Sequence, residues 1–343
     1  MNRSGITIQD VASRAGVSRS SVSRYLNGAT VREAKAIADA VADLSYEPSP
    51  IARSLRSGRT QSVGVVVADV ANPFFAAVFK GIEAVTRAYR DHHHDSVQLF
   101  LCNTEENPER LLELLDGLSG RVDGLIIAPP IETAPPEELL RQRVPVVLLD
   151  REFSGEPFAD TVLIDNEGGM AAAVRHLASL GHRRIGLISG PLDTTPGRRR
   201  HEGYLQGLRE AGLETPDELV AIGDFRKEGG HRGTAQLLTL DSPPTAIVAG
   251  NNMMALGALE QLAARDMRVP NDVSFVGFDD LEEAALLRPA ISTVSRPMAE
   301  QGSQAMSLLL ERLRGEGGPP RRIVLPTKFV DRESTGAPPG AGL

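Results

Sequence analysis

Apolar residues in the first sixty positions recur at the spacing of helices. The first predicted helix carries apolar residues three and four positions apart: Ile8, Val11, Ala12 and Ala15. Gly16 can adopt the left-handed backbone conformation that ends a helix, and the hydroxyl of Ser18 can cap the next one. Two further stripes follow, first Val22 and Leu26, and then Ala34, Ile37, Ala38, Val41 and Leu44. This order predicts a helix-turn-helix with a third helix behind it.

From Ser62 onward, short β-branched runs alternate with amphipathic segments. The apolar runs are SVGVVVAD, VQLFLCNT, GLIIAP, VPVVLLD, TVLIDN, RIGLISG, LVAIGDF, TAIVAGN and DVSFVGFDD. Continuous apolar strands that alternate with helices are typical of parallel sheets covered on both faces. These strands are too many for one doubly wound sheet, so we predict an α/β core of two doubly wound parallel sheets in two lobes.

The patterns also place domain boundaries. We assign residues 1–47 to the helix-turn-helix domain, 48–60 to a hinge helix and linker, 61–335 to the core, and 336–343 to a disordered tail. Within the core we expect the N-lobe at about 61–160 and 292–325, and the C-lobe at about 161–291 and 326–335.

Charge is distributed unevenly between these parts. The 343 residues carry a net charge of −8. Residues 1–60 hold nine Arg or Lys against five Asp or Glu, a net charge of +4, which leaves −12 for the remainder. A basic head on an acidic body predicts a polyanionic partner for the head alone.

The chain lacks the usual signals for secretion or membrane insertion. Its N-terminal segment, MNRSGITIQDVA, has no apolar stretch of the secretory kind, and no apolar run approaches the ~18 residues of a membrane span. The single cysteine, Cys102, fits a reducing compartment. We therefore expect a soluble cytoplasmic protein without a membrane partner.

The segment AGVSRSSVSRYLNG concentrates hydroxyls and guanidiniums on the second predicted helix. With the apolar stripe turned inward, Arg19, Ser20 and Ser23 share the outward face, and Arg24 lies beside them. An arginine can bind guanine O6 and N7 in the major groove, while serines can bond phosphates or base edges. This pattern indicates a DNA recognition helix. The alternative is that the serines cap and the arginines are simply solvated.

A second basic stretch, SPIARSLRSGRT, follows the three helices. Its apolar residues share one side, and its arginines lie elsewhere. A helix this short is marginal in water, but it can order on DNA with Leu55 as an apolar wedge in the minor groove. A flexible basic linker is the alternative interpretation.

Polar residues follow the predicted strands of the core. They include Asp69, Asn72, Asp150, Arg151, Asp224, Asn251, Asn252, Asp279 and Asp280, with Phe225 among them. Ligands of open α/β sheets bind beyond the carboxyl ends of the strands. Carboxylates, amides and guanidiniums beside an aromatic ring suit a sugar or polyol, and they also suit a nucleobase. Taken singly, such residues are also common helix caps.

Other chemistry is not indicated. The histidines of DHHHD, Asp91–Asp95, point in different directions and lack the i, i+4 spacing of a ligand pair, so we predict no metal site. The sequence has no phosphate-binding glycine loop, no GxSxG and no zinc spacing, so we predict no catalytic residues and no enzyme.

Five motifs occur in order between about Ile6 and about Val330: ITIQDVASRAGVSRSSVSRYLN, YEPSPIARSLRS, NPFF, RRRHEGY and VGFDD. Together they resemble the lactose-repressor/galactose-repressor (LacI/GalR) family of bacterial transcription regulators. The resemblance implies a DNA-binding domain, a hinge helix and a two-lobed core shaped like periplasmic sugar-binding proteins. It also implies a homodimer on a pseudo-palindromic operator, and a small-molecule effector with no cofactor.

Residue by residue, the resemblance implies three sets of contacts. It assigns base contacts to Arg19, Ser20 and Arg24, phosphate contacts to Ser18, Ser21, Ser23 and Asn27, and hinge contacts in the minor groove to Ala52, Arg53 and Leu55. It assigns effector contacts to Asn72, Phe74, Asp150, Arg200, Phe225, Asn251 and Asp279. The chain departs from the family in a shorter loop after Asn27, in Pro50 at the hinge, and in Asn252, where an Asp is often found.

We therefore predict a sequence-specific, double-stranded-DNA-binding repressor whose grip is tuned by a metabolite, a sugar or sugar derivative. A ligand that prefers one lobe arrangement biases the dimer, and induction and co-repression use this linkage with opposite sign. The competing interpretation is a cytosolic sugar-binding protein or enzyme with an accessory DNA-binding head, against which the basic head and hinge argue.

Overall fold

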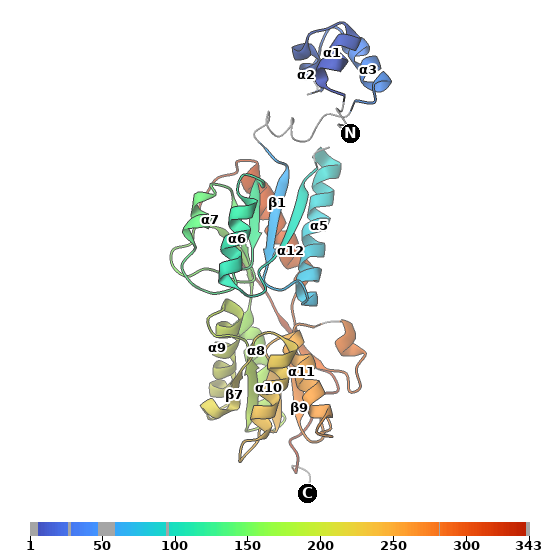
Figure 1. Ribbon diagram of the computed structural model, residues 1–343. Helices are drawn as coiled ribbons and strands as arrows, with labels where there is room; N and C mark the ends of the chain where they lie inside the picture. Colours follow the sequence, from blue (N-terminus) through green and yellow to red (C-terminus); the bar gives the residue numbers. More distant parts are fainter. Residues whose placement is uncertain (1–5, 27–28, 47–58, 94–95, 281, 341–343) are drawn as a thin grey trace. The chain divides into compact units, whose positions relative to one another are not determined.

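The computed structural model of the chain describes residues 6–26, 29–46, 59–93, 96–280 and 282–340. Its internal contacts divide the chain into two units, Met1–Thr60 and Gln61–Leu343, which we call the head and the core (Figure 1). The predicted DNA contacts Asn27, Ala52, Arg53 and Leu55 lie outside the described residues.

The described part of the head consists of helices around a small apolar core. They are α1 (Ile8–Ala15), α2 (Arg19–Leu26) and α3 (Ala34–Asp43). A capping box starts α1, since the Thr7 hydroxyl accepts from the Asp10 N–H (3.4 Å) and the Asp10 carboxylate accepts from the Thr7 N–H (2.7 Å). Gly16 ends α1 at φ +66°. Val11 and Val22 are fully buried, and the predicted helix-turn-helix is confirmed.

The first lobe of the core contains a parallel sheet of strand order β11-β5-β4-β3-β1-β2. Its strands are β1 (Ser62–Val67), β2 (Gln98–Asn103), β3 (Gly124–Ile127), β4 (Val146–Leu149), β5 (Asp160–Ile164) and β11 (Arg322–Leu325). One face is covered by α5 (Pro73–His93) and α12 (Met298–Leu313), and the other by α6 (Pro108–Leu118) and α7 (Glu137–Arg141) (Figure 1). Neighbouring residues of β1 alternate accordingly, with Val65 in one apolar layer and Val66 in the other.

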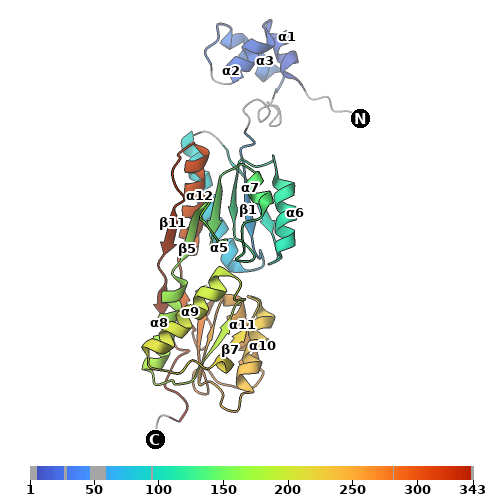
Figure 2. The same cartoon turned by 90° about the vertical axis from the view of Figure 1, so that its left-hand side faces the viewer.

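The second lobe contains a sheet of order β12-β10-β9-β8-β6-β7, parallel except where β12 runs against β10. Its strands are β6 (Ile185–Ser189), β7 (Val220–Ile222), β8 (Ala246–Ala249), β9 (Ser274–Phe278), β10 (Ser292–Ser295) and β12 (Lys328–Val330). The helices α8 (Asn166–Ser179) and α9 (Thr195–Glu210) cover one face, and α10 (Lys227–Leu238) and α11 (Asn252–Ala263) the other (Figure 2). Two 3₁₀ turns complete it, η1 (Asp217–Leu219) and η2 (Glu282–Ala285). The predicted fold class is confirmed.

The lobe boundaries differ from the predicted ones at two strands. We expected the C-lobe to begin at 161, but β5 pairs with β4 and β11 in the first sheet. We expected 292 to return the chain to the N-lobe, but β10 pairs with β9 in the second sheet. The chain therefore passes between the lobes after β5, after β10 and after β11. Both strands are apolar, and composition alone does not show which sheet supplies their hydrogen-bond partners.

The tail was also predicted wrongly at its start. Gly336 donates its N–H to the Ser274 hydroxyl (3.0 Å), and its carbonyl lies 2.9 Å from His182 Nε2. The backbone N–H of Phe275 donates to the Ser334 carbonyl (2.8 Å). These bonds hold the segment around 334–336 against β9, which composition alone did not reveal.

Neither a membrane span nor a metal site occurs in the described part of the chain. None of its helices is long and apolar enough to cross a membrane. None of its groups of His, Cys, Asp and Glu is arranged to hold a metal ion. Within DHHHD, α5 extends through His93.

Candidate functional site

The outward face of α2 carries the predicted base-reading residues. Arg19, Ser20 and Arg24 are exposed. Ser18 precedes the helix and caps it, because its hydroxyl accepts from the Ser21 N–H (3.2 Å). The same hydroxyl bonds to those of Ser20 (2.8 Å) and Ser21 (3.0 Å). The three serines thus form a small hydroxyl cluster at the N-terminal end of α2, where backbone N–H groups favour an anion.

The arginines of the head fall into two kinds. Arg14 pairs with Asp43, with Nη2 and Oδ2 2.5 Å apart. Within the described residues, Arg19 and Arg24 have no carboxylate partner. Ser23, between them on α2, is half-buried. The two arginines on α2 are therefore cations available to a partner, as a polyanion requires.

Polar residues of the core meet between its two lobes. We call Asp150, Arg151, Arg200, Asn252, Asp279, Arg296 and Gln301 the inter-lobe cluster. Each is at most 7% exposed. Asp150 and Arg151 follow β4, Asp279 follows β9, and Arg296 follows β10, so the carboxyl ends of strands from both sheets bring them together. Ionisable groups this deeply buried persist only when they are paired.

The backbone is constrained at three of the predicted effector contacts. Asp150, Phe225 and Asp279 have φ values of +64°, +61° and +70°. Residues other than glycine rarely adopt this region, and they cluster at functional sites where the surroundings enforce it. The chain therefore turns sharply as it leaves these strands and directs each side chain into the region between the lobes.

Arg296 joins the two lobes electrostatically. Its Nη1 donates to Asp150 Oδ1 (2.5 Å), and its Nε lies 2.7 Å from Asp279 Oδ1. Its guanidinium carbon lies 3.6 Å from the centroid of the Phe74 ring. Burial acts to raise the pKa of Asp150, but the guanidiniums of Arg296, Arg200 and Arg151 outweigh it and hold that pKa below its usual value.

Arg200 is held by neutral acceptors. Its Nε donates to Asn166 Oδ1 (2.7 Å) and its Nη1 to the carbonyl of Gly250 (2.5 Å). Its guanidinium carbon lies 3.8 Å from the centroid of the Phe278 ring, and Nη2 lies 3.8 Å from Asp279 Oδ1. Burial lowers the pKa of Arg200 to about 10, so the side chain stays charged near neutral pH.

Arg151 contacts both lobes in a different way. It forms a two-pronged ion pair with Glu106, at 2.5 and 2.7 Å, and donates to the carbonyls of Pro129 and Pro130. Its guanidinium carbon also lies 5.4 Å from the centroid of the Phe225 ring, which belongs to the second lobe. Burial alone would lower the pKa of Arg151, but Glu106 reverses the effect and raises it.

The predicted asparagines serve different purposes in the structure. Asn251 caps α11 by accepting from the Met254 N–H (2.8 Å), and its amide donates to the Phe225 carbonyl (2.9 Å). Asn72 accepts from the amide of Asn252 across the lobes (2.9 Å). The structure therefore brings Asn72 to the inter-lobe cluster but uses the Asn251 side chain locally.

Sequence reasoning missed two residues of the inter-lobe cluster as contacts. Arg296 directly follows β10, so the strand-end rule that found Asp279 would also have found it. Gln301 lies on α12, is fully buried, and directs its Nε2 at Asp150 Oδ1 (3.5 Å) and at the Val162 carbonyl (3.3 Å). A lone glutamine within an amphipathic helix gives no comparable signal.

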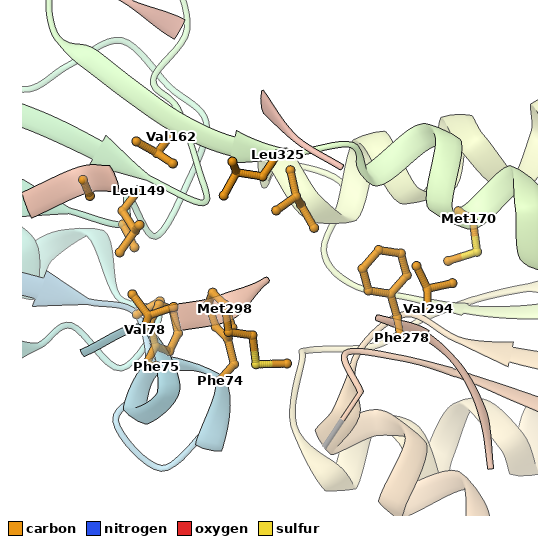
Figure 3. Packing of buried hydrophobic residues seen from close by; sticks show 14 of the residues in the cluster. Phe74, Phe75, Val78, Leu149, Val162, Met170, Phe278, Val294, Met298 and Leu325 are labelled. Atoms are coloured by element: carbon orange, nitrogen blue, oxygen red, sulfur yellow. The ribbon is translucent and has the colours of Figure 1, made fainter. Parts of the chain in front are cut away.

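Several buried polar atoms of the inter-lobe cluster have no hydrogen-bond partner among the described residues. They are Arg151 Nε, Arg200 Nη2, Asn252 Oδ1, Asp279 Oδ1, Arg296 Nε and Gln301 Oε1, of which the Arg296 and Asp279 atoms meet as an ion pair only. Such atoms are costly unless something bonds to them. Aromatic rings lie beside them, and Figure 3 shows Phe74 on the first lobe and Phe278 on the second within one buried cluster.

Comparison with known proteins places both units. Residues 7–49 match the family model of bacterial regulatory proteins of the lacI family, and residues 174–335 match the periplasmic binding protein-like domain. The ribose operon repressor of Escherichia coli (strain K12) is 35% identical over 336 residues, which cover 96% of this chain and 99% of that protein. The chain belongs to the lacI family. It is a DNA-binding transcriptional repressor with a helix-turn-helix head and an effector-binding core.

Solved structures of lacI-family regulators agree with this fold. The lac repressor dimer bound to operator and the anti-inducer ONPF is 28% identical, covers 97% of this chain and 99% of its own, and has a TM-score of 0.80. The complex of the regulator CelR with cellobiose is 32% identical, covers 96% and 100%, and has a TM-score of 0.74. These similar proteins are transcription regulators, and this lacI-family chain shares their two-part organisation.

Proposed function

We propose that this lacI-family repressor binds a pseudo-palindromic operator as a homodimer and releases or tightens it when a neutral monosaccharide enters the inter-lobe cluster. The observation that carries the sugar assignment is the set of buried polar atoms without hydrogen-bond partners, ringed by aromatic side chains. A monosaccharide supplies several hydroxyls that both donate and accept, and apolar ring faces that stack on aromatic groups.

Charge balance supports a neutral ligand. Arg151, Arg200 and Arg296 contribute three positive charges, and the carboxylates of Asp150, Asp279 and Glu106 contribute three negative charges. An anionic or cationic ligand would add an uncompensated charge to a buried region, at a large desolvation cost. A polyol adds none.

The proposed effector contacts are therefore grouped by what their side chains have left to offer. Asp150, Arg200 and Asp279 bond sugar hydroxyls, Phe74 and Phe225 pack on the ring, and Asn72 positions the amide of Asn252. Arg151, Arg296 and Gln301 join the predicted set. Asn251 acts by positioning, since its amide fixes the Phe225 backbone and its carbonyl caps α11.

On DNA, we assign base contacts to Arg19, Ser20 and Arg24. Their exposure, and the lack of carboxylate partners for the two arginines among the described residues, support this assignment. Ser18, Ser21 and Ser23 at the N-terminal half of α2 are assigned to phosphates, together with Asn27. The minor-groove contacts Ala52, Arg53 and Leu55 rest on the family resemblance alone.

The two functions are linked through the lobe arrangement. A ligand that bonds to side chains of both lobes stabilises one arrangement over the other, which changes the preference of the dimer for operator. A coupling of ~1–3 kcal/mol, usual for allostery, changes operator affinity ~5- to 150-fold.

Exposed apolar side chains on the edge strand β2 support the homodimer. Phe100 is 43% exposed and Leu101 is 48% exposed. An uncovered apolar edge strand invites pairing with a second copy. Size-exclusion chromatography with light scattering should give a dimer for the full chain and a larger monomer fraction for Leu101→Lys; a monomeric full chain would overturn this part.

The sugar assignment is tested by thermal shift and operator anisotropy on the full chain. The probes are D-ribose and cellobiose, whose names occur among the similar proteins, with D-glucose and hypoxanthine added. We expect a sugar to raise the melting temperature and change operator affinity, and Asp279→Asn to abolish both responses. Asp116→Asn, an exposed substitution of the same kind on α6, should retain them.

The outcomes separate the two halves of the proposal. If hypoxanthine but no sugar stabilises the protein, the cluster recognises a nucleobase and the sugar assignment is wrong. If a sugar binds but operator affinity does not change, the link between the lobes and DNA is wrong.

A further inference from the structure

An apolar cavity adjoins the inter-lobe cluster. Its volume is about 230 Å³, and Asn252 and Asp279 belong to both its wall and the cluster. Most of the remaining wall is apolar, with Ala255, Leu256 and Leu259 contributed by α11. The cavity is therefore continuous with the proposed sugar site through two shared side chains.

The wall draws on both lobes. Pro73, the first residue of α5, belongs to the first lobe, whereas Phe278 and the α11 residues belong to the second. A group that fills the cavity would contact both lobes, as the sugar does in the neighbouring cluster. Occupancy would therefore favour the same lobe arrangement as the proposed effector.

We propose that this cavity binds an apolar, ring-sized substituent of the effector, so that the repressor responds to aryl or alkyl glycosides more strongly than to the free sugar. The inference rests on the proposed sugar function. An apolar cavity of about 150 Å³ is enough to bind benzene, so the volume here accommodates a phenyl group. The shared residues Asn252 and Asp279 place that group beside the sugar rather than at a separate site.

The composition of the wall selects an aglycone rather than a nucleobase. A nucleobase carries several donors and acceptors that need partners when buried. Among the polar side chains that line the cavity, the Thr293 hydroxyl already accepts from Arg332 Nη1 (3.2 Å), and the amide of Asn252 is bonded to Asn72. The remaining surface favours carbon, and each buried CH₂ adds affinity through the hydrophobic effect.

The test is isothermal titration calorimetry on the full chain with matched ligands. The probes are D-ribose and D-glucose and their methyl and phenyl glycosides, each as both anomers. For a sugar that binds, we expect one phenyl glycoside to bind at least ~10-fold more tightly than the corresponding methyl glycoside.

Filling the cavity should remove this advantage. Ala255→Leu places an isobutyl group in it, and the phenyl glycoside should then bind no better than the methyl glycoside. Gly277→Ala is the milder variant, because a Cβ there meets Thr293, Ala255 and Ile291 at 3.5–4.0 Å, which are ordinary contacts. Ala263→Leu, at an exposed position of the same helix, is the matched control and should keep the full advantage.

Each outcome decides between the two proposals. If a free sugar binds but phenyl and methyl glycosides of both anomers bind equally, the apolar subsite is wrong and the sugar function stands. A phenyl advantage that survives both cavity-filling variants also overturns the subsite. If no sugar or glycoside binds, the sugar function is wrong and the subsite falls with it.

Discussion

Replacing Arg296 with glutamine removes a cation that touches carboxylates of both lobes. The Arg296 side chain is 2% exposed, and its partners Asp150 and Asp279 are 4% and 2% exposed. Breaking a buried ion pair by removing one partner costs about 3–5 kcal/mol, because the other charge stays buried and unpaired. Arg200 remains 3.8 Å from Asp279 and offsets part of this cost, so we expect a loss near ~3 kcal/mol.

This loss should be visible in thermal unfolding. For a unit of this size, 1 kcal/mol shifts the melting temperature by roughly 2–4 °C, so Arg296→Gln should lower it by about 6–12 °C. Differential scanning calorimetry of the full chain measures the shift. Arg314→Gln, which removes a half-exposed surface arginine paired with Glu316, is the control and should change the melting temperature little.

The pH dependence gives a second, independent check. In the unaltered protein the pKa of Asp150 is held low, so its ion pairs contribute stability that is present above the unfolded pKa and lost as pH falls toward the folded value. Without Arg296, burial dominates and the folded pKa rises above the unfolded one. The variant should then lose stability as pH rises, so its deficit should be larger at pH 8 than at pH 5. A deficit below ~1 °C, or an equal deficit at both pH values, would refute the reasoning.

Three further predictions address the head and the second lobe. Arg24→Ala should weaken binding to a specific operator ~5- to 150-fold in fluorescence anisotropy, with little effect on random DNA; equal losses on both would make Arg24 a phosphate contact. Thr7→Ala should destabilise the head by about 1 kcal/mol, measured by its own unfolding transition, and an unchanged transition would show that the capping box does not matter. Burial lowers the pKa of His182, so this group contributes stability that is present above its unfolded pKa and declines as pH falls from 7 to 5; His182→Gln should flatten that slope, and a parallel slope would contradict the assignment.

The periodicity of the sequence predicted the elements well and the lobe boundaries less well. The helical stripes of the head and the alternating strands of the core are local patterns, and both are present in the structure. The sheet to which β5 or β10 belongs is a question of long-range pairing. Their apolar compositions fit either sheet, so no local signal separates the two possibilities.

The site was predictable where the strand-end rule applied to single residues. Asp150, Phe225 and Asp279 follow strands and do converge between the lobes. The rule does not show how a side chain is used, and Asn251 is occupied by capping and by the Phe225 carbonyl. It also gives no access to Gln301, because that residue reaches the cluster from within a helix that is distant in sequence.

The chain's repeated passage between its two sheets has a practical consequence for dissecting the protein. Neither lobe is a continuous stretch of sequence, so a truncation after β5 would omit β11, the neighbour of β5 in the first sheet. A proteolytic cut in any single connection would leave two covalent tethers in place. Fragment expression should therefore give insoluble halves, whereas a nicked core should still migrate as one particle under native conditions and separate only in denaturant.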